Sequence, residues 1–275
     1  MEILSCKNVA FKYTESTEYA ISDCTFSVKK GEKVMLCGAS GSGKSTLLSL
    51  LKREVSPRGE LSGEIDLIGR AATELSDRES AEKIGFVMQD PDSQTVCDKV
   101  SSELAFGLES FGTPSKEIQS RVGEMAAFFG IEPLYDRDIS TLSGGQKQLV
   151  SLCSIMVTDP DILLLDEPTA QLDPVAAREL LGILDRLNKE MGVTVIIAEH
   201  DPEELFDSCD KILYLSKGKT AFFDTPAKAA KYFAQNDLEG FLPETAKVFS
   251  GLCSDLPLNV RQGRAQLEKL ATEDI

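Results

Sequence analysis

The sequence predicts an α/β protein built on a mostly parallel sheet that helices cover on both faces. Continuous apolar runs of strand length, such as 162–165 and 193–198, alternate with helical patterns such as 174–190. Strands that are buried on both faces have this composition. A glycine-rich loop at 38–46 also stands between one such run and a helix. The 275 residues suffice for one large domain, or for one domain with a smaller appendix.

The chain begins with a β-rich segment, residues 3–30. Its second half, 21–28, alternates in polarity and places Cys24, Phe26 and Val28 on one face. Tyr13 opens the polar turn that precedes this half. If the segment folds over a nucleotide, the Tyr13 ring can stack on adenine. An ordinary edge-strand tyrosine is an equally good interpretation.

The loop at 38–46 fits the phosphate-loop pattern of glycine, four residues, glycine, lysine and then serine or threonine. Its members are Gly38, Ala39, Ser40, Gly41, Ser42, Gly43, Lys44, Ser45 and Thr46. An apolar strand at 34–37 precedes it, and the helix that follows is predicted from 47–51. Such a loop brings backbone N–H groups and a helix N-terminus up to phosphate oxygens. Lys44 can then reach the outer phosphates, and the Ser45 hydroxyl can ligate Mg²⁺.

The middle of the chain alternates between turns, helices and strands. We expect a hairpin around 59–69, a short polar helix through 76–79 and a strand at 84–88 that ends on Gln89. Residues 100–130 have a helical pattern, which a glycine and a proline interrupt near 112–114.

Four predicted strands end on polar residues: the phosphate loop, Gln89, the pair Asp166 and Glu167, and His200. Ligands of open α/β sheets bind beyond the carboxyl ends of the strands, so one site can collect all four groups. Asp166 is suited to hold Mg²⁺ and Glu167 to polarise the attacking water, since adjacent buried carboxylates are unfavourable without a cation. His200, the single histidine, is predicted to contact the γ-phosphate, and the Gln89 amide to contact the metal or the water.

Ser143, Gly144 and Gly145 open another helix, which the sequence predicts over 149–157. A hydroxyl, bare backbone and a helix N-terminus together make a second anion-binding device. One nucleotide does not need two such devices from the same chain. We therefore expect this loop to complete the site of a second copy.

The composition restricts the possible partners. A net charge of −16 argues against broad contact with nucleic acid or an anionic membrane surface. The seven cysteines form no C-x-x-C pair and are expected to be reduced thiols. The sequence shows no secretory signal and no membrane span, so any membrane role is expected to come through a partner.

The order of these motifs resembles that of the ATP-binding cassette (ABC) ATPases. The discriminating feature is the run Leu142-Ser143-Gly144-Gly145-Gln146 between the phosphate loop and Asp166. The resemblance implies a phosphate-loop NTPase fold with a RecA-like core sheet, an antiparallel β subdomain and a helical signature subdomain. It also implies an ATPase that uses ATP and Mg²⁺.

The resemblance further implies roles for individual residues. Gly38–Thr46 resembles Walker A, Asp166 and Glu167 resemble the Walker B carboxylate and the general base, and His200 resembles the switch histidine. Tyr13 resembles the adenine-stacking aromatic residue, and Gln89 the glutamine that touches Mg²⁺ and water. The signature Ser143–Gln146 resembles the segment that binds the γ-phosphate held by the opposite subunit. Asp173 resembles the aspartate at the interface of a head-to-tail dimer.

A narrower resemblance is to the ATPases of energy-coupling factor (ECF) transporters, the vitamin and cobalt or nickel importers. Residues 89–94, 103–109 and 198–201 are similar to their characteristic segments. The resemblance implies an ATPase domain at 1–220 and a small helical extension at 221–275. It also implies a transmembrane coupling protein and a substrate-binding membrane protein as partners, with the chain peripheral on the cytoplasmic face of the membrane.

Two alternatives share this chemistry. The first is the ATPase of a conventional ABC importer or exporter. The second is a soluble ABC protein that acts on DNA or ribosomes, but such proteins usually carry coiled-coil arms or two cassettes, and this sequence has one signature and no heptad arm. A homodimer and a pair of non-identical ATPases both remain possible, and the transported solute leaves no trace in these motifs.

Overall fold

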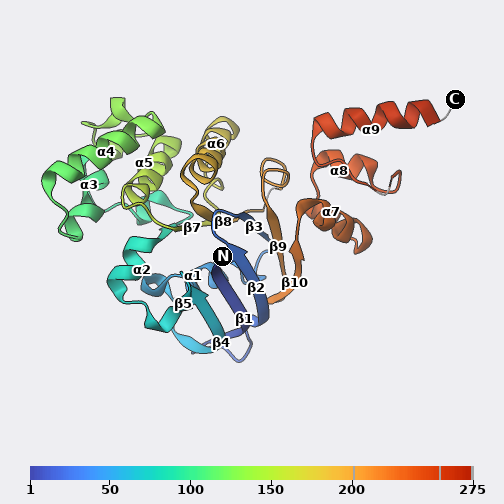
Figure 1. Ribbon diagram of the computed structural model, residues 1–275, viewed down its shortest axis with the longest axis horizontal. Helices are drawn as coiled ribbons and strands as arrows, with labels where there is room; N and C mark the ends of the chain where they lie inside the picture. Colours follow the sequence, from blue (N-terminus) through green and yellow to red (C-terminus); the bar gives the residue numbers. More distant parts are fainter. Residues whose placement is uncertain (201, 254, 274–275) are drawn as a thin grey trace.

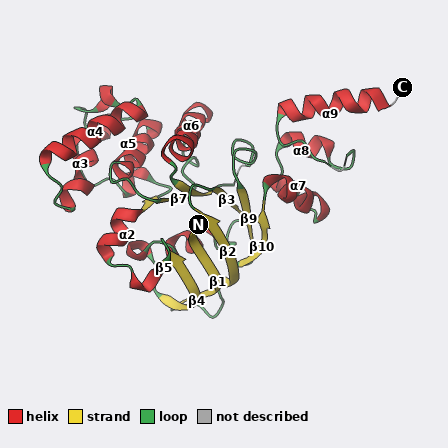
Figure 2. Cartoon of the chain, viewed as in Figure 1, coloured by secondary structure: helices red, strands yellow, loops and turns green. Residues whose placement is uncertain are grey.

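The structure is a computed structural model that describes residues 1–200, 202–253 and 255–273. Asp201, part of the predicted segment 198–201, lies outside the described residues. Two sheets form the centre of the molecule, and helices surround the larger one (Figures 1 and 2). The predicted α/β class, with a mostly parallel sheet covered by helices, is confirmed.

The larger sheet has six strands in the order β10-β9-β3-β8-β7-β6. Five of them run parallel, and β10 pairs antiparallel with β9 at one edge. Their bounds are β3 (Lys33–Cys37), β6 (Ile84–Val87), β7 (Ile162–Asp166), β8 (Thr194–Ala198), β9 (Lys211–Ser216) and β10 (Lys219–Asp224). The order brings the carboxyl ends of β3, β8, β7 and β6 to one edge, as the polar strand ends predict.

The smaller sheet is antiparallel, in the order β2-β1-β4-β5. Its strands are β1 (Glu2–Tyr13), β2 (Ile21–Lys29), β4 (Gly59–Leu67) and β5 (Arg70–Ala71). Cys24, Phe26 and Val28 are buried on one face of β2, as their alternation predicts. This sheet therefore contains the predicted β-rich segment and the predicted hairpin.

The six-stranded sheet separates two hydrophobic cores. Alternate residues of β3 show this, because Val34 and Leu36 belong to one core and Met35 and Cys37 to the other. The first core also contains the antiparallel sheet and the helix after the phosphate loop, and the second contains buried residues of the helices that lie between residues 100 and 249. Burial on both faces explains why these strands read as continuous apolar runs.

In the part of the chain that the structure describes, six helices precede β9. They are α1 (Lys44–Leu50), α2 (Asp77–Lys83), α3 (Val100–Ser110), α4 (Ser115–Phe129), α5 (Gly144–Met156) and α6 (Pro174–Met191). The predicted break between α3 and α4 is present at 111–114. Short 3₁₀ turns lie at Arg53–Val55, Ala72–Glu74, Pro91–Ser93, Glu132–Leu134, Ile139–Thr141 and Glu239–Phe241. Nowhere in the described chain is a helix both long and apolar enough to span a bilayer.

Two helices begin earlier than the apolar pattern predicts. α1 starts at Lys44 rather than near 47, and α5 starts at Gly144 rather than near 149. In α5 the Ser143 side chain accepts a hydrogen bond from the Gln146 N–H group, and the Gln146 side chain accepts one from Ser143 N–H. This capping box allows the first turn to form without an apolar face.

The C-terminal segment is helical, with α7 (Pro226–Gln235), α8 (Glu244–Phe249) and α9 (Val260–Glu273). α9 projects away from the sheets in Figure 1. Phe222 of β10 stacks on Tyr232 of α7, with ring centroids 4.9 Å apart. β10 runs through residue 220, where the sequence predicts the domain boundary. The division into 1–220 and 221–275 stays a prediction. Because β10 extends to Asp224, the structure favours a boundary after that residue.

Candidate active site

The phosphate loop curls around the side chain that it carries. Lys44 is buried, and its Nζ donates a hydrogen bond to the Gly38 carbonyl at 3.0 Å. A Cβ atom on Gly38 would lie 2.4 Å from the Leu215 carbonyl oxygen, and one on Gly43 would lie 2.7 Å from the Ala20 carbonyl oxygen. Both distances are too short for any side chain, so the close approach of the neighbouring backbone requires glycine at both positions.

Glu167 is the point at which the predicted catalytic residues meet. Its Oε1 lies 2.7 Å from His200 Nε2 and 3.9 Å from Lys44 Nζ. Its Oε2 accepts a long hydrogen bond of 3.5 Å from Gln89 Nε2. The structure therefore brings together side chains from α1 and from the ends of β6, β7 and β8, as the sequence predicts.

The backbone of Glu167 is strained. Its φ of 48° lies in the left-handed region, which a residue with a long side chain seldom adopts. The Glu167 N–H group donates to the Ala198 carbonyl at 3.0 Å, which ties the strained residue to the end of β8. Strain of this kind persists only where the surroundings impose it, and it is commonly found at functional sites.

Asp166 and Ser45 form the part of the site that suits a cation. Ser45 Oγ donates to Asp166 Oδ1 at 3.0 Å. Burial raises the pKa of Asp166, and the neighbouring Glu167 raises it further. A hydroxyl, a carboxylate and the amide oxygen of Gln89 are the hard oxygen donors that Mg²⁺ prefers, so these residues fit that ion.

Tyr13 lies beside the end of the phosphate loop. Its hydroxyl is 2.8 Å from the Thr46 hydroxyl. β1 pairs with β2 as far as Phe11, whereas Tyr13 pairs with Gly59 of β4. The ring remains 39% exposed, which leaves a face open beside the loop.

The signature residues lie at the start of α5, whereas the phosphate loop precedes and enters α1. Within residues 1–200, 202–253 and 255–273, no hydrogen bond joins Ser143–Gln146 to Gly38–Thr46. A Cβ on Gly145 would lie 2.8 Å from Ala176 Cβ, so the start of α5 packs tightly against the start of α6. Asp173 caps α6 by accepting hydrogen bonds from the N–H groups of Val175 and Ala176, at 2.9 and 3.1 Å.

The sequence analysis missed one buried bridge in the site. Glu199 Oε1 accepts hydrogen bonds from Thr169 Oγ1 at 2.7 Å and from Thr169 N–H at 3.1 Å. Burial raises the pKa of Glu199, although these hydrogen bonds oppose the shift. The bridge joins the segment after Glu167 to the residue before His200. A carboxylate directly after a buried strand was the available signal, but its partner is not readable from the sequence.

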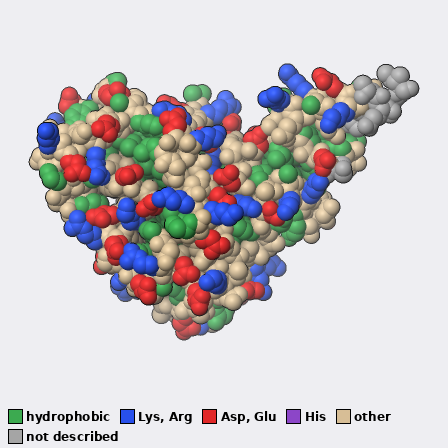
Figure 3. All heavy atoms as spheres, viewed as in Figure 1, with side chains coloured by type: hydrophobic (Ala, Val, Ile, Leu, Met, Phe, Trp, Pro, Cys, Tyr) green, Lys and Arg blue, Asp and Glu red, His purple; other side chains and the backbone are tan. Residues whose placement is uncertain are grey.

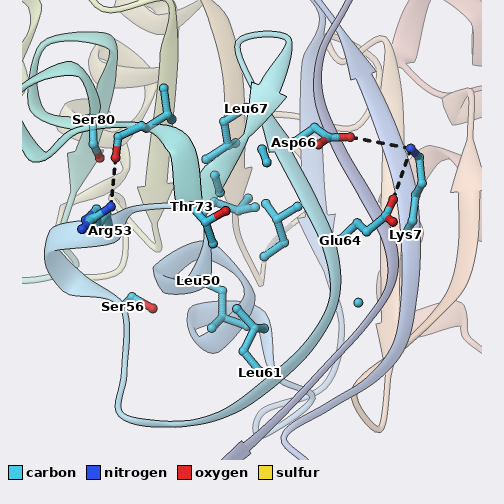
Figure 4. A pocket seen from close by; sticks show the side chains of 16 residues that line it. Lys7, Leu50, Arg53, Ser56, Leu61, Glu64, Asp66, Leu67, Thr73 and Ser80 are labelled. Atoms are coloured by element: carbon cyan, nitrogen blue, oxygen red, sulfur yellow. Dashed lines mark hydrogen bonds and ion pairs between the residues drawn. The ribbon is translucent and has the colours of Figure 1, made fainter.

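A cavity of about 880 Å³ lies elsewhere, between β4 and the end of α1 (Figure 4). Its charged side chains are already paired with one another or with backbone. Lys7 Nζ lies 3.6 Å from both Glu64 Oε2 and Asp66 Oδ2, and Arg53 donates to the Leu75 carbonyl at 2.9 Å. This cavity therefore shows no chemistry that competes with the sheet edge.

Comparison with known proteins decides the family. The model of the family described as "ABC transporter" matches residues 21–170, which include both the phosphate loop and Glu167. The chain belongs to the ABC transporter family. The predicted ATPase class is thereby confirmed, since the matched family's cassettes bind and hydrolyse ATP.

Individual relatives within the ABC family differ in length. An ABC transporter ATP-binding protein of Bacillus cereus is 40% identical over 262 residues, which are 94% of this chain and 47% of that protein. The chain thus spans about half the length of this and similar relatives. The energy-coupling factor transporter ATP-binding protein EcfA1 of Streptococcus pneumoniae is 37% identical over 264 residues, which are 94% of each chain.

Solved ABC structures have the same fold. The structure of cbiO1 from Clostridium perfringens, part of the ABC transporter complex cbiONQ, has a TM-score of 0.76 at 32% identity. The match covers 86% of this chain and 94% of cbiO1. The cassette MJ0796, a dimer bound to ADP and Pi, has a TM-score of 0.69 at 28% identity, covering 81% of this chain and 98% of MJ0796.

Proposed function

We propose that this chain binds and hydrolyses Mg·ATP as the ATP-binding subunit of a membrane importer of the energy-coupling factor type. The observation that carries the hydrolytic part is the convergence on Glu167. Lys44, Gln89 and His200 reach this carboxylate from three separate segments. A carboxylate so surrounded beside a phosphate loop is placed to act on a terminal phosphate.

The phosphate loop holds the triphosphate. The N–H groups of Gly38–Thr46 and the N-terminus of α1 face the phosphate oxygens, and Lys44 neutralises charge on the outer phosphates. Tyr13 stacks on adenine with its exposed face. Ser45, Asp166 and Gln89 would hold Mg²⁺, which would supply positive charge beside the phosphate oxygens.

Glu167 is the general base. It polarises a water that attacks the γ-phosphorus, and the bond from that phosphorus to the bridging oxygen breaks to give ADP and phosphate. His200 contacts the γ-phosphate, and Gln89 orients the water. In the structure both Glu167 oxygens have partners, His200 Nε2 and Lys44 Nζ at one and Gln89 Nε2 at the other. The bound nucleotide must draw these partners toward itself to free the carboxylate.

A second ATPase subunit completes each site. Ser143–Gln146 starts a helix whose N-terminus favours an anion, and it makes no hydrogen bond with its own phosphate loop in the described chain. We propose that it contacts the γ-phosphate bound to the opposite subunit in a head-to-tail dimer, with Asp173 at the interface. The dimeric form of MJ0796 with ADP and Pi supports this arrangement.

The importer class rests on similarity. Support comes from the EcfA1 protein, which matches over 94% of both chains, and from cbiO1. We propose that the subunit sits peripherally on the cytoplasmic face of the membrane, with a transmembrane coupling protein and a substrate-binding membrane protein. Nucleic acid is not a partner in this proposal, because the net charge of −16 repels it.

The Glu167→Gln variant tests the chemistry. Removing the base should slow ATP hydrolysis by on the order of 10²–10⁴ while ATP binding persists. Glu15→Gln, an exposed turn residue, makes the same chemical change as a control and should hydrolyse ATP normally. Steady-state phosphate release, compared with equilibrium ATP binding, distinguishes the two. Normal hydrolysis by Glu167→Gln would remove the general-base role.

A pull-down of the tagged chain from detergent-solubilised native membranes tests the importer class. Mass spectrometry should identify a coupling membrane protein together with one or more substrate-binding membrane proteins. Recovery of two conventional permease subunits instead would assign the chain to an ordinary ABC transporter. Recovery without any membrane protein would contradict the transport role.

A further inference from the structure

The turn between β9 and β10 touches the phosphate loop from outside. The N–H group of Gly218 donates a hydrogen bond to the Ser42 carbonyl oxygen at 3.0 Å. The Gly218 carbonyl accepts one from the Ser22 N–H group at 2.8 Å. This one turn residue therefore links the phosphate loop to the start of β2.

The geometry of this turn is rigid. It consists of Lys217 and Gly218, with φ values of 48° and 76°. Two positive φ angles in a two-residue hairpin loop indicate a type I′ turn, whose twist matches that of the paired strands. A lysine seldom adopts such an angle, so the pairing of β9 with β10 imposes the turn. The donor at Gly218 is consequently held in place by the sheet.

There is no free space around this contact. A Cβ on Gly218 would lie 2.6 Å from the Ala20 carbonyl oxygen and 3.1 Å from Ile21 Cα. A Cβ on Gly43 of the phosphate loop would lie 2.7 Å from the same Ala20 oxygen. The hairpin turn and the phosphate loop thus both pack against the carbonyl group of Ala20. A displacement of the turn must therefore move the loop or that carbonyl group.

We propose that Gly218 is a positioning residue for the phosphate loop and that it sets the affinity for ATP. By holding the Ser42 carbonyl, it fixes the peptides whose N–H groups point at the triphosphate. An array of N–H donors binds an anion strongly only when it is ordered before the anion arrives. The inference rests on the proposed function of this loop as an ATP site.

The Gly218→Ala variant tests the inference, with Gly69→Ala as its matched control. Gly69 lies in the β4–β5 turn with a φ of 75°, nearly the same angle, but a Cβ added to it would meet no atom within 4 Å. Both variants therefore carry the same backbone strain, and only Gly218→Ala adds a collision with the peptide that the phosphate loop shares.

Binding of a non-hydrolysable ATP analogue with Mg²⁺ is measured by calorimetry, and the melting temperature is measured alongside it. We expect the Kd of Gly218→Ala to rise by on the order of tenfold or more, since small displacements of positioning groups have effects of this size. Gly69→Ala should bind as the wild type does, although the shared backbone strain lowers its melting temperature too. Equal Kd values for the two variants would reduce Gly218 to a structural role and overturn the inference.

Hydrogen exchange in the wild-type protein tests the same contact if Gly218→Ala does not fold. Binding of the analogue should slow exchange at the Gly218 amide together with the amides of 38–46, and should leave Gly69 unchanged. Protection of the loop without protection of Gly218 would overturn the inference while the ATP site stands. Absence of protection in the loop itself would contradict the proposed function instead.

Discussion

At the level of single residues, Glu199 shows how the active site is held together. Its buried carboxylate accepts two hydrogen bonds from Thr169, two residues beyond Glu167. It also precedes His200, whose Nε2 lies 2.7 Å from Glu167 Oε1. Glu199 thus connects the two segments that carry Glu167 and His200.

The buried Glu199 carboxyl should make stability depend on pH in an unusual direction. Burial raises its pKa in the folded state, so the folded protein holds this proton more tightly than the unfolded chain does. Stability due to this group is therefore present at low pH and is lost as pH rises from about 4.3, the ordinary glutamate pKa, through the raised value. Glu199→Gln removes this loss.

Denaturant unfolding of the wild type and Glu199→Gln across the acidic range measures the effect. The stability of the variant relative to the wild type should increase as pH rises through this window. Glu15→Gln is the control, because it removes an equal charge from an exposed turn. A difference between wild type and Glu199→Gln that stays constant with pH would show that this carboxyl does not titrate as argued.

The individual motif residues could be predicted because few kinds of side chain can bind phosphate or assist its transfer. Lys44, Gln89, Glu167 and His200 follow strand ends, and parallel strands bring their ends to one edge. Glu199 and Gly218 could not be assigned in this way. Their roles depend on contacts with Thr169 and Ser42, and only the folded chain reveals those partners.

At the level of elements, the buried strands were the most predictable part, because burial on both faces leaves an unbroken apolar run. The starts of α1 and α5 were predicted too late. Apolar periodicity marks the middle of a helix, whereas the cap and the loop before it determine where the helix begins. In α5 the capping residues are the signature residues themselves.

The β9–β10 hairpin shows a different limit of sequence analysis. Its strand β9 pairs with β3 beside the phosphate loop, and no pattern in the sequence indicates this neighbour. Pairing order depends on the path of the whole chain, which local patterns do not contain. Residue 220, the predicted domain boundary, lies within β10, and the division of the chain stays a prediction.

At the level of the whole molecule, the net negative charge of the chain differs from the local charge at the phosphate loop. Figure 3 shows acidic and basic side chains interspersed over the visible face. The chain has a net charge of −16, yet Lys44 and the N-terminus of α1 supply local positive charge at the phosphate loop.

The signature and the phosphate loop belong to one chain, but they make no hydrogen bond with each other among the described residues. We propose that a complete site needs two chains.

Mixing two inactive variants tests this central claim most directly. Lys44→Ala removes the phosphate-loop lysine, and Ser143→Arg blocks the signature. In a mixed dimer one site combines the intact Lys44 of one chain with the intact Ser143 of the other. Each variant alone is expected to release no phosphate from ATP, and the mixture is expected to regain hydrolysis. Hydrolysis at the wild-type rate by Ser143→Arg alone would show that the site does not need the signature of a second chain.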